Sequence, residues 1–226
     1  MQDLVKQERF ELEVLERLNS KRLLNKIVFG GETMLRLCYG LNRFSVDLDF
    51  WITRRVERNK LFKDLKEALE QSYQVKDCVN KFYTMLFEIK SRDYPRSLKI
   101  EIRKETRKIT AEKAIAYSRH SNIQVFLNTV SLNDMMKSKI SAFLDRREIR
   151  DVFDMEFLFK RGIELDAPAA VLGRLLKGID SLTKKDYAVK LGSLLEQNER
   201  QYYIRQNFKL LKGAIKDKIE RLSSKK

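Results

Sequence analysis

The stretch KIVFGGETMLRLCYGLNRFSVDLDF, residues 26–50, decides the fold that we expect for this chain. It opens with a short apolar run that ends in Gly30-Gly31, and residues 32–39 then follow at helical spacing. Its last part belongs to an alternating segment, SVDLDFWI, residues 45–52. An apolar run before a glycine turn and an alternating segment are typical of strands. The stretch therefore predicts a strand, a helix and a second strand in succession.

The rest of the chain predicts strands mixed with helices before residue 130 and helices alone after it. The predicted strands are 26–29, 45–52, 73–79, 82–90, 97–104 and 123–129. The predicted helices are 3–24, 32–39, 56–72, 131–146, 149–161, 168–178, 184–198 and 201–222. We therefore expect an α+β fold, with a mixed sheet and helices in a domain of residues 1–130. A helical domain of residues 131–226 should pack against it and contribute to an active-site cleft.

Composition narrows the classes of function. The chain has 226 residues and 43% hydrophobic content, enough for a core without disulfides or structural metal. Two cysteines and one histidine exclude Cys/His zinc sites and triads that need several histidines. Apolar runs are too short to span a membrane and the first residues lack a signal-peptide core, so we expect a cytoplasmic protein. The net charge of +15 favours phosphate polymers as partners, although a merely soluble basic surface has the same charge.

The strongest chemical signal is the Asp47-Leu48-Asp49 triplet. Residues two apart on a strand point to the same face, so Asp47 and Asp49 should project side by side. Two adjacent carboxylates repel each other, and Mg²⁺ is a suitable compensating ion because it prefers oxygen ligands. Glu101, in the alternating segment 97–104, would be a third carboxylate if the two strands adjoin. Three carboxylates can hold two metal ions for phosphoryl transfer. The alternatives are two solvated aspartates and a Glu101 that pairs with Lys or Arg across strands.

The Gly30-Gly31 turn is a weaker signal. Glycines let backbone N–H groups approach phosphate oxygens at a helix N-terminus, but ordinary turns use the same pair. The Gly-Lys-Ser/Thr of a P-loop and the dinucleotide-binding fingerprint are both missing. The turn therefore fits a phosphate site of another kind.

Two blocks of sequence together resemble the AbiEii/AbiGii toxin-type nucleotidyltransferases. Residues 31–50, GETMLRLCYGLNRFSVDLDF, are similar to the family's Gly-Gly-Thr-x-Leu-Arg-Leu followed by Arg-x-Ser-x-Asp-x-Asp. Residues 139–147, KISAFLDRR, with 150–154, RDVFD, are similar to its Lys-x-x-Ala…Arg…Arg-Asp-x-x-Asp segment. The resemblance covers residues 26–160.

The resemblance implies a DNA polymerase β-like nucleotidyltransferase core, a two-metal Mg²⁺ site and a set of functional residues. The implied catalytic residues are Asp47, Asp49, Glu101, Lys139 and Asp151, of which the first three would bind Mg²⁺. The implied substrate-binding residues are Gly30, Gly31, Thr33, Arg43 and Ser45. Glu32 departs from the family, which more often has Gly or Ser there, and its carboxylate would repel phosphate unless it turns away. Without the resemblance, residues 149–161 also fit an ordinary amphipathic helix in which Arg150, Asp151 and Asp154 form surface pairs.

The resulting hypothesis is an enzyme that moves a nucleoside monophosphate from an NTP to an acceptor hydroxyl. Resemblance to the family implies a toxin of a toxin–antitoxin or phage-defence pair, with a possible cognate antitoxin. The positive charge favours RNA, perhaps the tRNA 3′ end, as acceptor. The alternatives are an enzyme that modifies a protein, a catalytically silent RNA-binding protein and a metal-dependent nuclease. Tyr202, Tyr203 and Phe208 could stack on bases or, as such residues more often do, belong to the core.

Overall fold

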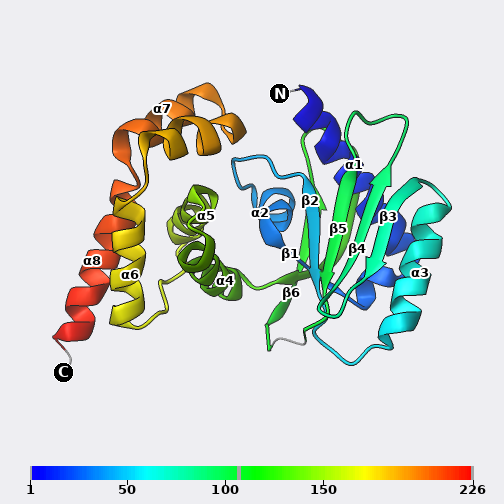
Figure 1. Ribbon diagram of the computed structural model, residues 1–226, viewed down its shortest axis with the longest axis horizontal. Coiled ribbons are helices and arrows are strands. Elements are labelled where there is room, and N and C mark those ends of the chain that lie inside the picture. The colour runs from blue at the N-terminus through cyan, green and yellow to red at the C-terminus, as the bar shows by residue number, and fades with distance from the viewer. Residues whose placement is uncertain (1, 106–107, 225–226) are drawn as a thin grey trace. The chain divides into compact units, whose positions relative to one another are not determined.

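The computed structural model describes residues 2–105 and 108–224, which divide after Ser131 into an N-terminal and a C-terminal unit (Figure 1). The N-terminal unit combines a mixed sheet with helices, and the C-terminal unit is helical. This architecture confirms the α+β fold class. Within the described ranges, no helix has both the length and the apolar character needed to cross a bilayer.

The N-terminal unit is built around one seven-stranded sheet with the order β3-β4-β5-β2-β1-β7-β6. Its strands are β1 (Val28–Gly30), β2 (Asp47–Trp51), β3 (Gln74–Asn80), β4 (Thr84–Lys90), β5 (Leu98–Arg103), β6 (Ala111–Tyr117) and β7 (Gln124–Val130). Its helices are α1 (Gln2–Ser20), the short 3-10 helix η1 (Leu23–Asn25), α2 (Gly31–Tyr39) and α3 (Arg58–Glu70). The strands β2 and β5 are parallel, as are β1 and β7, and every other neighbouring pair is antiparallel.

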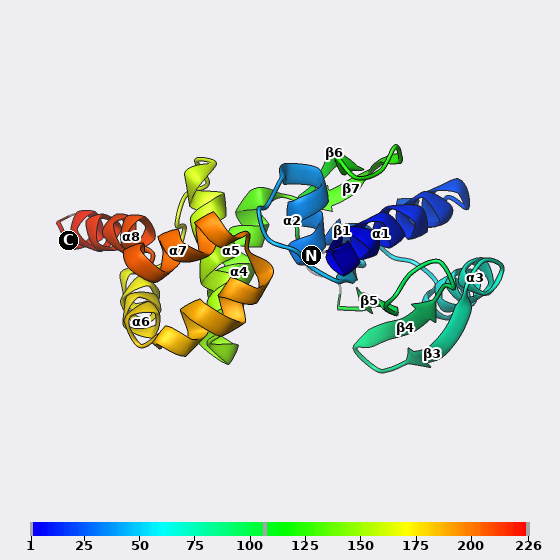
Figure 2. The ribbon, with the colours of Figure 1, turned by 90° about the horizontal axis from the view of Figure 1, so that it is seen from above.

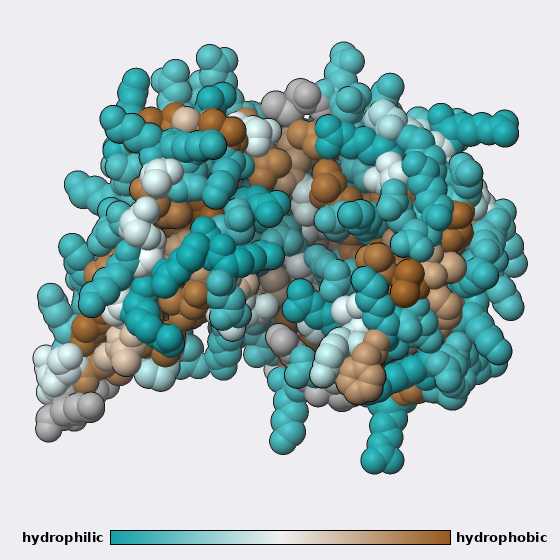
Figure 3. All heavy atoms as spheres, viewed as in Figure 1, coloured by the Kyte–Doolittle hydropathy of each residue, from teal (hydrophilic) through white to brown (hydrophobic). Residues whose placement is uncertain are grey.

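Strand alternation divides the sheet into an apolar and a polar face. On β5, Leu98, Ile100 and Ile102 are fully buried, while the residues between them are partly or fully exposed. Helices α1 and α3 lie on the same side of the sheet (Figures 1 and 2), and Phe62 of α3 stacks on the buried Phe87 of β4. The core therefore lies under these helices. The surface that faces the viewer in Figure 3 is mainly hydrophilic in the N-terminal unit, with scattered hydrophobic residues.

The C-terminal unit contains helices of very different length and regularity. They are α4 (Leu132–Arg146), α5 (Ile149–Lys160), α6 (Ala169–Asp180), the π-helical segment η2 (Asp186–Leu191), the 3-10 turn η3 (Gly192–Leu194), α7 (Gln197–Gln206) and α8 (Lys209–Ser223). Phe153 of α5 packs against Tyr203, which in turn packs against Phe208, with ring centroids 5.0 and 5.1 Å apart. These rings form part of the core of this unit.

Three expectations about single helices are wrong, and one strand was not expected. The helix expected over 3–24 ends at Ser20, because the backbone turns into a left-handed conformation at Arg22, with φ 59°. The strand β6 was not expected, and it pairs along the whole of β7. The helix expected over 184–198 is replaced by η2 and η3. The helix expected over 201–222 is two helices, because Asn207 and Phe208 both have positive φ, and the break lets Phe208 bury its ring.

Candidate active site

The Asp47-Leu48-Asp49 triplet lies on β2, next to the strand that carries Glu101. Leu48 and Phe50 are fully buried, so the alternation directs Asp47 and Asp49 to the opposite face. Strands β2 and β5 are parallel, with Asp49 directly opposite Glu101. Neighbouring strands lie about 4.8 Å apart, so this register brings three carboxylates onto one small area of the sheet.

The electrostatics at Asp49 show a local excess of negative charge. Burial raises the pKa of its carboxyl to about 7, and the neighbouring carboxylates of Glu32 and Glu101 add to the shift. Arg103 opposes it with a smaller effect. A further positive charge, in addition to that of Arg103, would favour the ionised form of Asp49. The set of oxygen donors and this excess of negative charge both fit a hard divalent cation such as Mg²⁺.

The Gly30-Gly31 turn holds the N-terminus of α2 against these carboxylates. Gly31 begins α2 with φ 73°, a left-handed conformation that strains other residues. A Cβ at Gly31 would lie only 2.8 Å from Cβ of Asp49, and a Cβ at Gly30 would overlap the ring of Trp51. The backbone N–H groups at the start of α2 therefore lie beside Asp49, where they could bind phosphate oxygens.

The remaining predicted substrate residues lie around the same turn. The Thr33 hydroxyl donates a hydrogen bond of 2.5 Å to the carbonyl of Asp47, which fixes α2 to the start of β2. The Arg43 side chain is only 1% exposed and lies 3.6 Å from the Glu32 carboxylate. This contact directs Glu32 toward a cation and offsets the repulsion that its charge would exert on phosphate. Ser45 is half-buried in the segment before β2.

Glu101 has a partner on its own strand. The Arg103 guanidinium lies 3.8 Å from Glu101 Oε1 and also covers the ring of Trp51, 5.5 Å from its centroid. The Glu101 side chain remains 38% exposed. Glu101 thus lies opposite Asp49 and also contacts an arginine of its own strand, whereas the alternative from the sequence was a Lys or Arg partner across strands.

In the C-terminal unit, Lys139 and Asp151 belong to a buried network of charges. The Lys139 ammonium lies 2.7 Å from Asp154 and 3.4 Å from Asp151, and both carboxylates are fully buried. Arg146 donates two hydrogen bonds to Asp151, of 2.8 and 2.6 Å. The alternative in which Asp151 and Asp154 form surface pairs is therefore wrong, whereas Arg150 is exposed. Each of the two buried aspartates therefore has a cationic partner.

Sequence reasoning missed the roles of Arg146 and Asp154 in that network. Arg146 ends α4 and Asp151 lies in the first turn of α5, so their contact crosses a helix junction. Helical spacing could not have selected Arg146 over Arg147 or Arg150. The spacing of Asp151 and Asp154, three residues apart on α5, was the one signal that they share a face.

The aromatic residues of the last third are mostly core residues. Tyr203 is 6% exposed and Phe208 is 1% exposed, whereas Tyr202 is 47% exposed. The base-stacking alternative is therefore wrong for Tyr203 and Phe208.

The comparisons with known proteins agree with this geometry. The family model of the nucleotidyl transferase AbiEii toxin, of type IV toxin–antitoxin systems, matches residues 13–218. Since the match covers most of the chain, the protein belongs to this family and is a nucleotidyltransferase toxin. Membership implies a nucleotide substrate and a cognate antitoxin.

Two crystal structures from Helicobacter pylori share the fold. JHP933 is 24% identical, with a TM-score of 0.59 over 95% of this chain and 96% of that protein. A protein described as a "putative nucleotidyltransferase" is also 24% identical, with a TM-score of 0.60 over 94% of this chain and 96% of its own. No curated protein matches the sequence significantly.

Proposed function

We propose that this toxin transfers a nucleoside monophosphate from an NTP to a hydroxyl group of RNA, with the tRNA 3′ end as acceptor. The reaction depends on Mg²⁺ in this proposal. The observation that supports it most is the register of β2 and β5, which sets Asp49 opposite Glu101 beside the N-terminus of α2.

The metal ligands in this proposal are Asp47, Asp49 and Glu101. When bound there, Mg²⁺ would supply positive charge that stabilises the in-line displacement at the transferred phosphorus. The chain's own part is to hold the three carboxylates in place. Thr33 fixes the start of β2 to α2, and Arg103 orients Glu101.

The backbone at Gly30 and Gly31 binds the triphosphate in this proposal. The N–H groups at the start of α2 point outward from the helix and attract anions. Gly31 is required for that approach because any side chain there would displace the Asp49 carboxylate. Arg43 acts indirectly, by holding the Glu32 carboxylate.

Lys139 and Asp151 are assigned to the reaction from the family resemblance. A lysine that stabilises charge moving toward the leaving pyrophosphate lowers the barrier to transfer more than it strengthens binding. Asp151, Asp154 and Arg146 hold Lys139 within the C-terminal unit. Transfer assays on variants of Lys139 therefore test its role in the reaction.

RNA is the proposed acceptor because of the charge of the protein. The excess of 47 basic over 32 acidic residues favours a polyanion over most protein surfaces. If phosphate contacts dominate, the logarithm of the RNA affinity should fall linearly with the logarithm of the salt concentration. A flat response would favour a protein acceptor.

Incubation with each labelled NTP, Mg²⁺ and total RNA tests the proposal directly. Label joined to RNA is the expected result, and Asp47→Asn and Asp49→Asn should abolish it while the fold persists. The matched control is Asp77→Asn, an exposed carboxylate on β3 that should transfer like wild type. RNA binding without transfer, shortened RNA, or label on protein would each replace the proposal with one of its alternatives.

A further inference from the structure

The turn between β3 and β4 carries two aromatic side chains that the core does not use. Phe82 is 83% exposed and Tyr83 is 71% exposed, more than any other large hydrophobic side chain in the described ranges. Their rings meet edge to face, with centroids 4.6 Å apart. Exposed aromatic rings in water are costly unless something covers them, so this pair indicates a binding surface.

Three segments of the N-terminal unit meet at this turn and surround it with positive charge. The Lys104 ammonium donates to the carbonyl of Lys81, and the Lys104 amide donates to the carbonyl of Tyr83 at 2.8 Å. Burial lowers the pKa of Lys104, and the nearby charge of Arg58, the first residue of α3, lowers it further. The turn is thus connected to the end of β5 and to the start of α3.

Two acidic residues, Glu57 and Glu105, lie next to Arg58 and Lys104 in the sequence. The Glu57 carboxylate accepts hydrogen bonds from the amides of Asn59 and Lys60 as the N-cap of α3. Arg58 and Lys81 are exposed, and Lys81 directly precedes the aromatic pair in the turn. Rings and cations on one surface are the combination that binds single-stranded nucleic acid, because bases stack on the rings and phosphates contact the cations.

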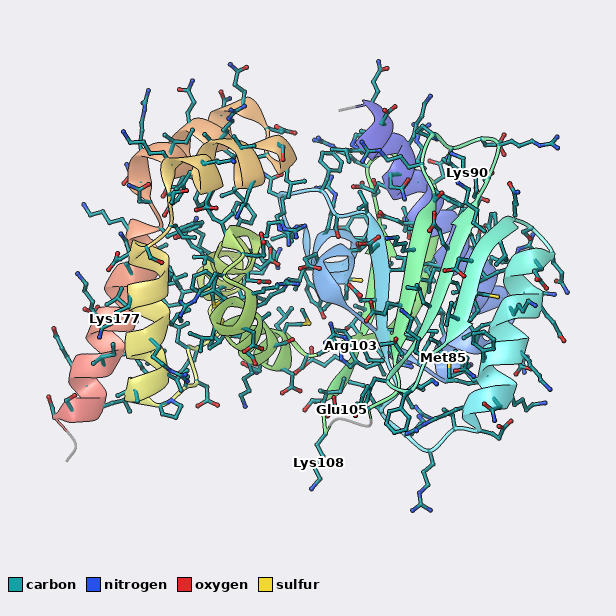
Figure 4. The ribbon with its side chains drawn as sticks, viewed as in Figure 1. Met85, Lys90, Arg103, Glu105, Lys108 and Lys177 are labelled. Atoms are coloured by element: carbon teal, nitrogen blue, oxygen red, sulfur yellow. The ribbon has the colours of Figure 1, made fainter. Side chains whose placement is uncertain are left out.

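The turn also lies close to the carboxylates along β5. Arg103 is opposite Thr84, the first residue of β4, and it follows Glu101 by two positions. Two residues of strand span about 7 Å. Figure 4 shows Arg103 and Met85 of β4 at the same end of the sheet. An RNA strand that is stacked on the turn can therefore extend to Glu101 along one face of the unit.

We propose that Phe82, Tyr83, Lys81 and Arg58 form a platform for the single-stranded end of the acceptor RNA. This inference rests on the proposed function, since it specifies the RNA that the enzyme modifies. A single strand is required because bases in a duplex are already stacked and cannot cover the rings. The cations around the rings favour RNA over an apolar protein partner.

RNA binding without NTP is the first test, measured by fluorescence anisotropy with a short single-stranded RNA and its duplex. The Phe82→Ala/Tyr83→Ala variant should bind the single strand at least tenfold more weakly, with an unchanged salt slope. The Lys81→Ala variant should make that slope shallower by about 0.7, the value for one lost phosphate contact. The matched control is Tyr117→Ala/Phe126→Ala, which removes rings that are 57% and 59% exposed on the β6–β7 hairpin. The control should bind like wild type.

A conservative pair of variants separates base stacking from apolar contact. Phe82→Leu/Tyr83→Leu keeps apolar side chains at the turn but removes the flat rings. It should lose as much RNA affinity as the alanine pair. If it binds like wild type, or if the alanine pair does, the platform is refuted. Preference for the duplex, or no binding of RNA at low salt, refutes it as well.

Transfer assays distinguish failure of the platform from failure of the proposed function. If the wild-type protein labels RNA and the Phe82→Ala/Tyr83→Ala variant has an unchanged KM for RNA, the platform is refuted and the proposed function stands. If the wild-type protein labels no RNA but binds the single strand through these rings, the proposed transfer is refuted and the platform stands. The expected result is a KM for RNA raised at least tenfold and an unchanged KM for NTP.

Discussion

Removal of the Lys139 charge should destabilise the protein much more than removal of a neighbouring surface lysine. Lys139→Met keeps the side-chain length but leaves the Asp154 carboxylate buried without the ammonium that lies 2.7 Å away. Loss of one partner of a buried ion pair costs about 3–5 kcal/mol in free energy of unfolding. Arg146 still neutralises Asp151 in this variant, so the loss should fall within that range.

Lys137→Met is the control, because Lys137 lies on the same helix but pairs at the surface. Its partner Asp166 is 3.2 Å away, and the two side chains are 54% and 76% exposed. An exposed pair contributes under about 1 kcal/mol. Urea denaturation of both variants measures the difference. Equal, small losses for Lys137→Met and Lys139→Met would refute the argument for a buried ion pair.

A second variant decides whether Lys139 also acts in the reaction. Lys139→Met/Asp154→Asn removes both charges, and it should recover about 2 kcal/mol of the stability that Lys139→Met loses. If Lys139 stabilises the transition state, this double variant should still transfer about 10²-fold more slowly than wild type. If transfer recovers along with stability, Lys139 has only a structural role.

Three further predictions concern the N-terminal unit. Because the pKa of Asp49 is raised to about 7, ionisation of this carboxyl destabilises the folded protein. The loss of stability begins above about pH 4, where Asp49 ionises in the unfolded chain, and is complete above pH 7. Asp49→Asn should therefore stabilise the metal-free protein at pH 8 but not at pH 4, as urea titrations in EDTA would show. Glu11 is buried, and within the described ranges neither of its carboxylate oxygens has a hydrogen-bond partner. Burial raises its pKa well above the usual value, so Glu11→Met should raise the free energy of unfolding at pH 8 by about 1–3 kcal/mol. A lower free energy of unfolding in urea denaturation would contradict this. Gly31→Ala should abolish transfer by displacing Asp49, whereas Gly162→Ala, with φ 83° and open space around it, should lose about 1 kcal/mol of stability and keep wild-type transfer.

The strands that carry the carboxylates were predictable because their signals are local. In β2 and β5, alternation over five or six residues assigns each side chain to a face, and both assignments are correct. The register that sets Asp49 opposite Glu101 was not predictable. It joins segments about fifty residues apart and depends on how the whole sheet assembles.

The predictions of other elements failed because tertiary contacts override the local preference of the sequence. The strand β6, AEKAIAY, has Ile115 as its one β-branched residue, a weak signal for a strand, and it forms at the sheet edge through its pairing with β7. The sequence around Asn207 and Phe208 has continuous helical spacing, yet the chain breaks there. Burial of the Phe208 ring against Tyr187 and Tyr203 compensates for two residues in a left-handed conformation.

The two clusters of charge differ in a way that bears on which of them takes a metal. In the C-terminal unit, Asp151 and Asp154 are matched by Arg146 and Lys139, at distances of 2.6 to 3.4 Å. Each of these two carboxylates already has a cationic side-chain partner, so a cation that entered between them would have to displace a side chain.

In the N-terminal unit, the balance is the reverse. Arg43 compensates Glu32, and Arg103 lies 3.8 Å from Glu101, yet the pKa of Asp49 remains raised. The negative charge of the carboxylates around Asp49 therefore exceeds the positive charge of the arginines beside them, and a bound divalent cation would neutralise the excess. Since the turn at Gly31, which we propose as the phosphate site, adjoins the same carboxylate, the metal and the triphosphate would bind together, and each would raise the affinity of the other. Mg²⁺ should accordingly bind more tightly in the presence of a non-hydrolysable NTP, and equal affinity with and without it in calorimetry would separate the two sites.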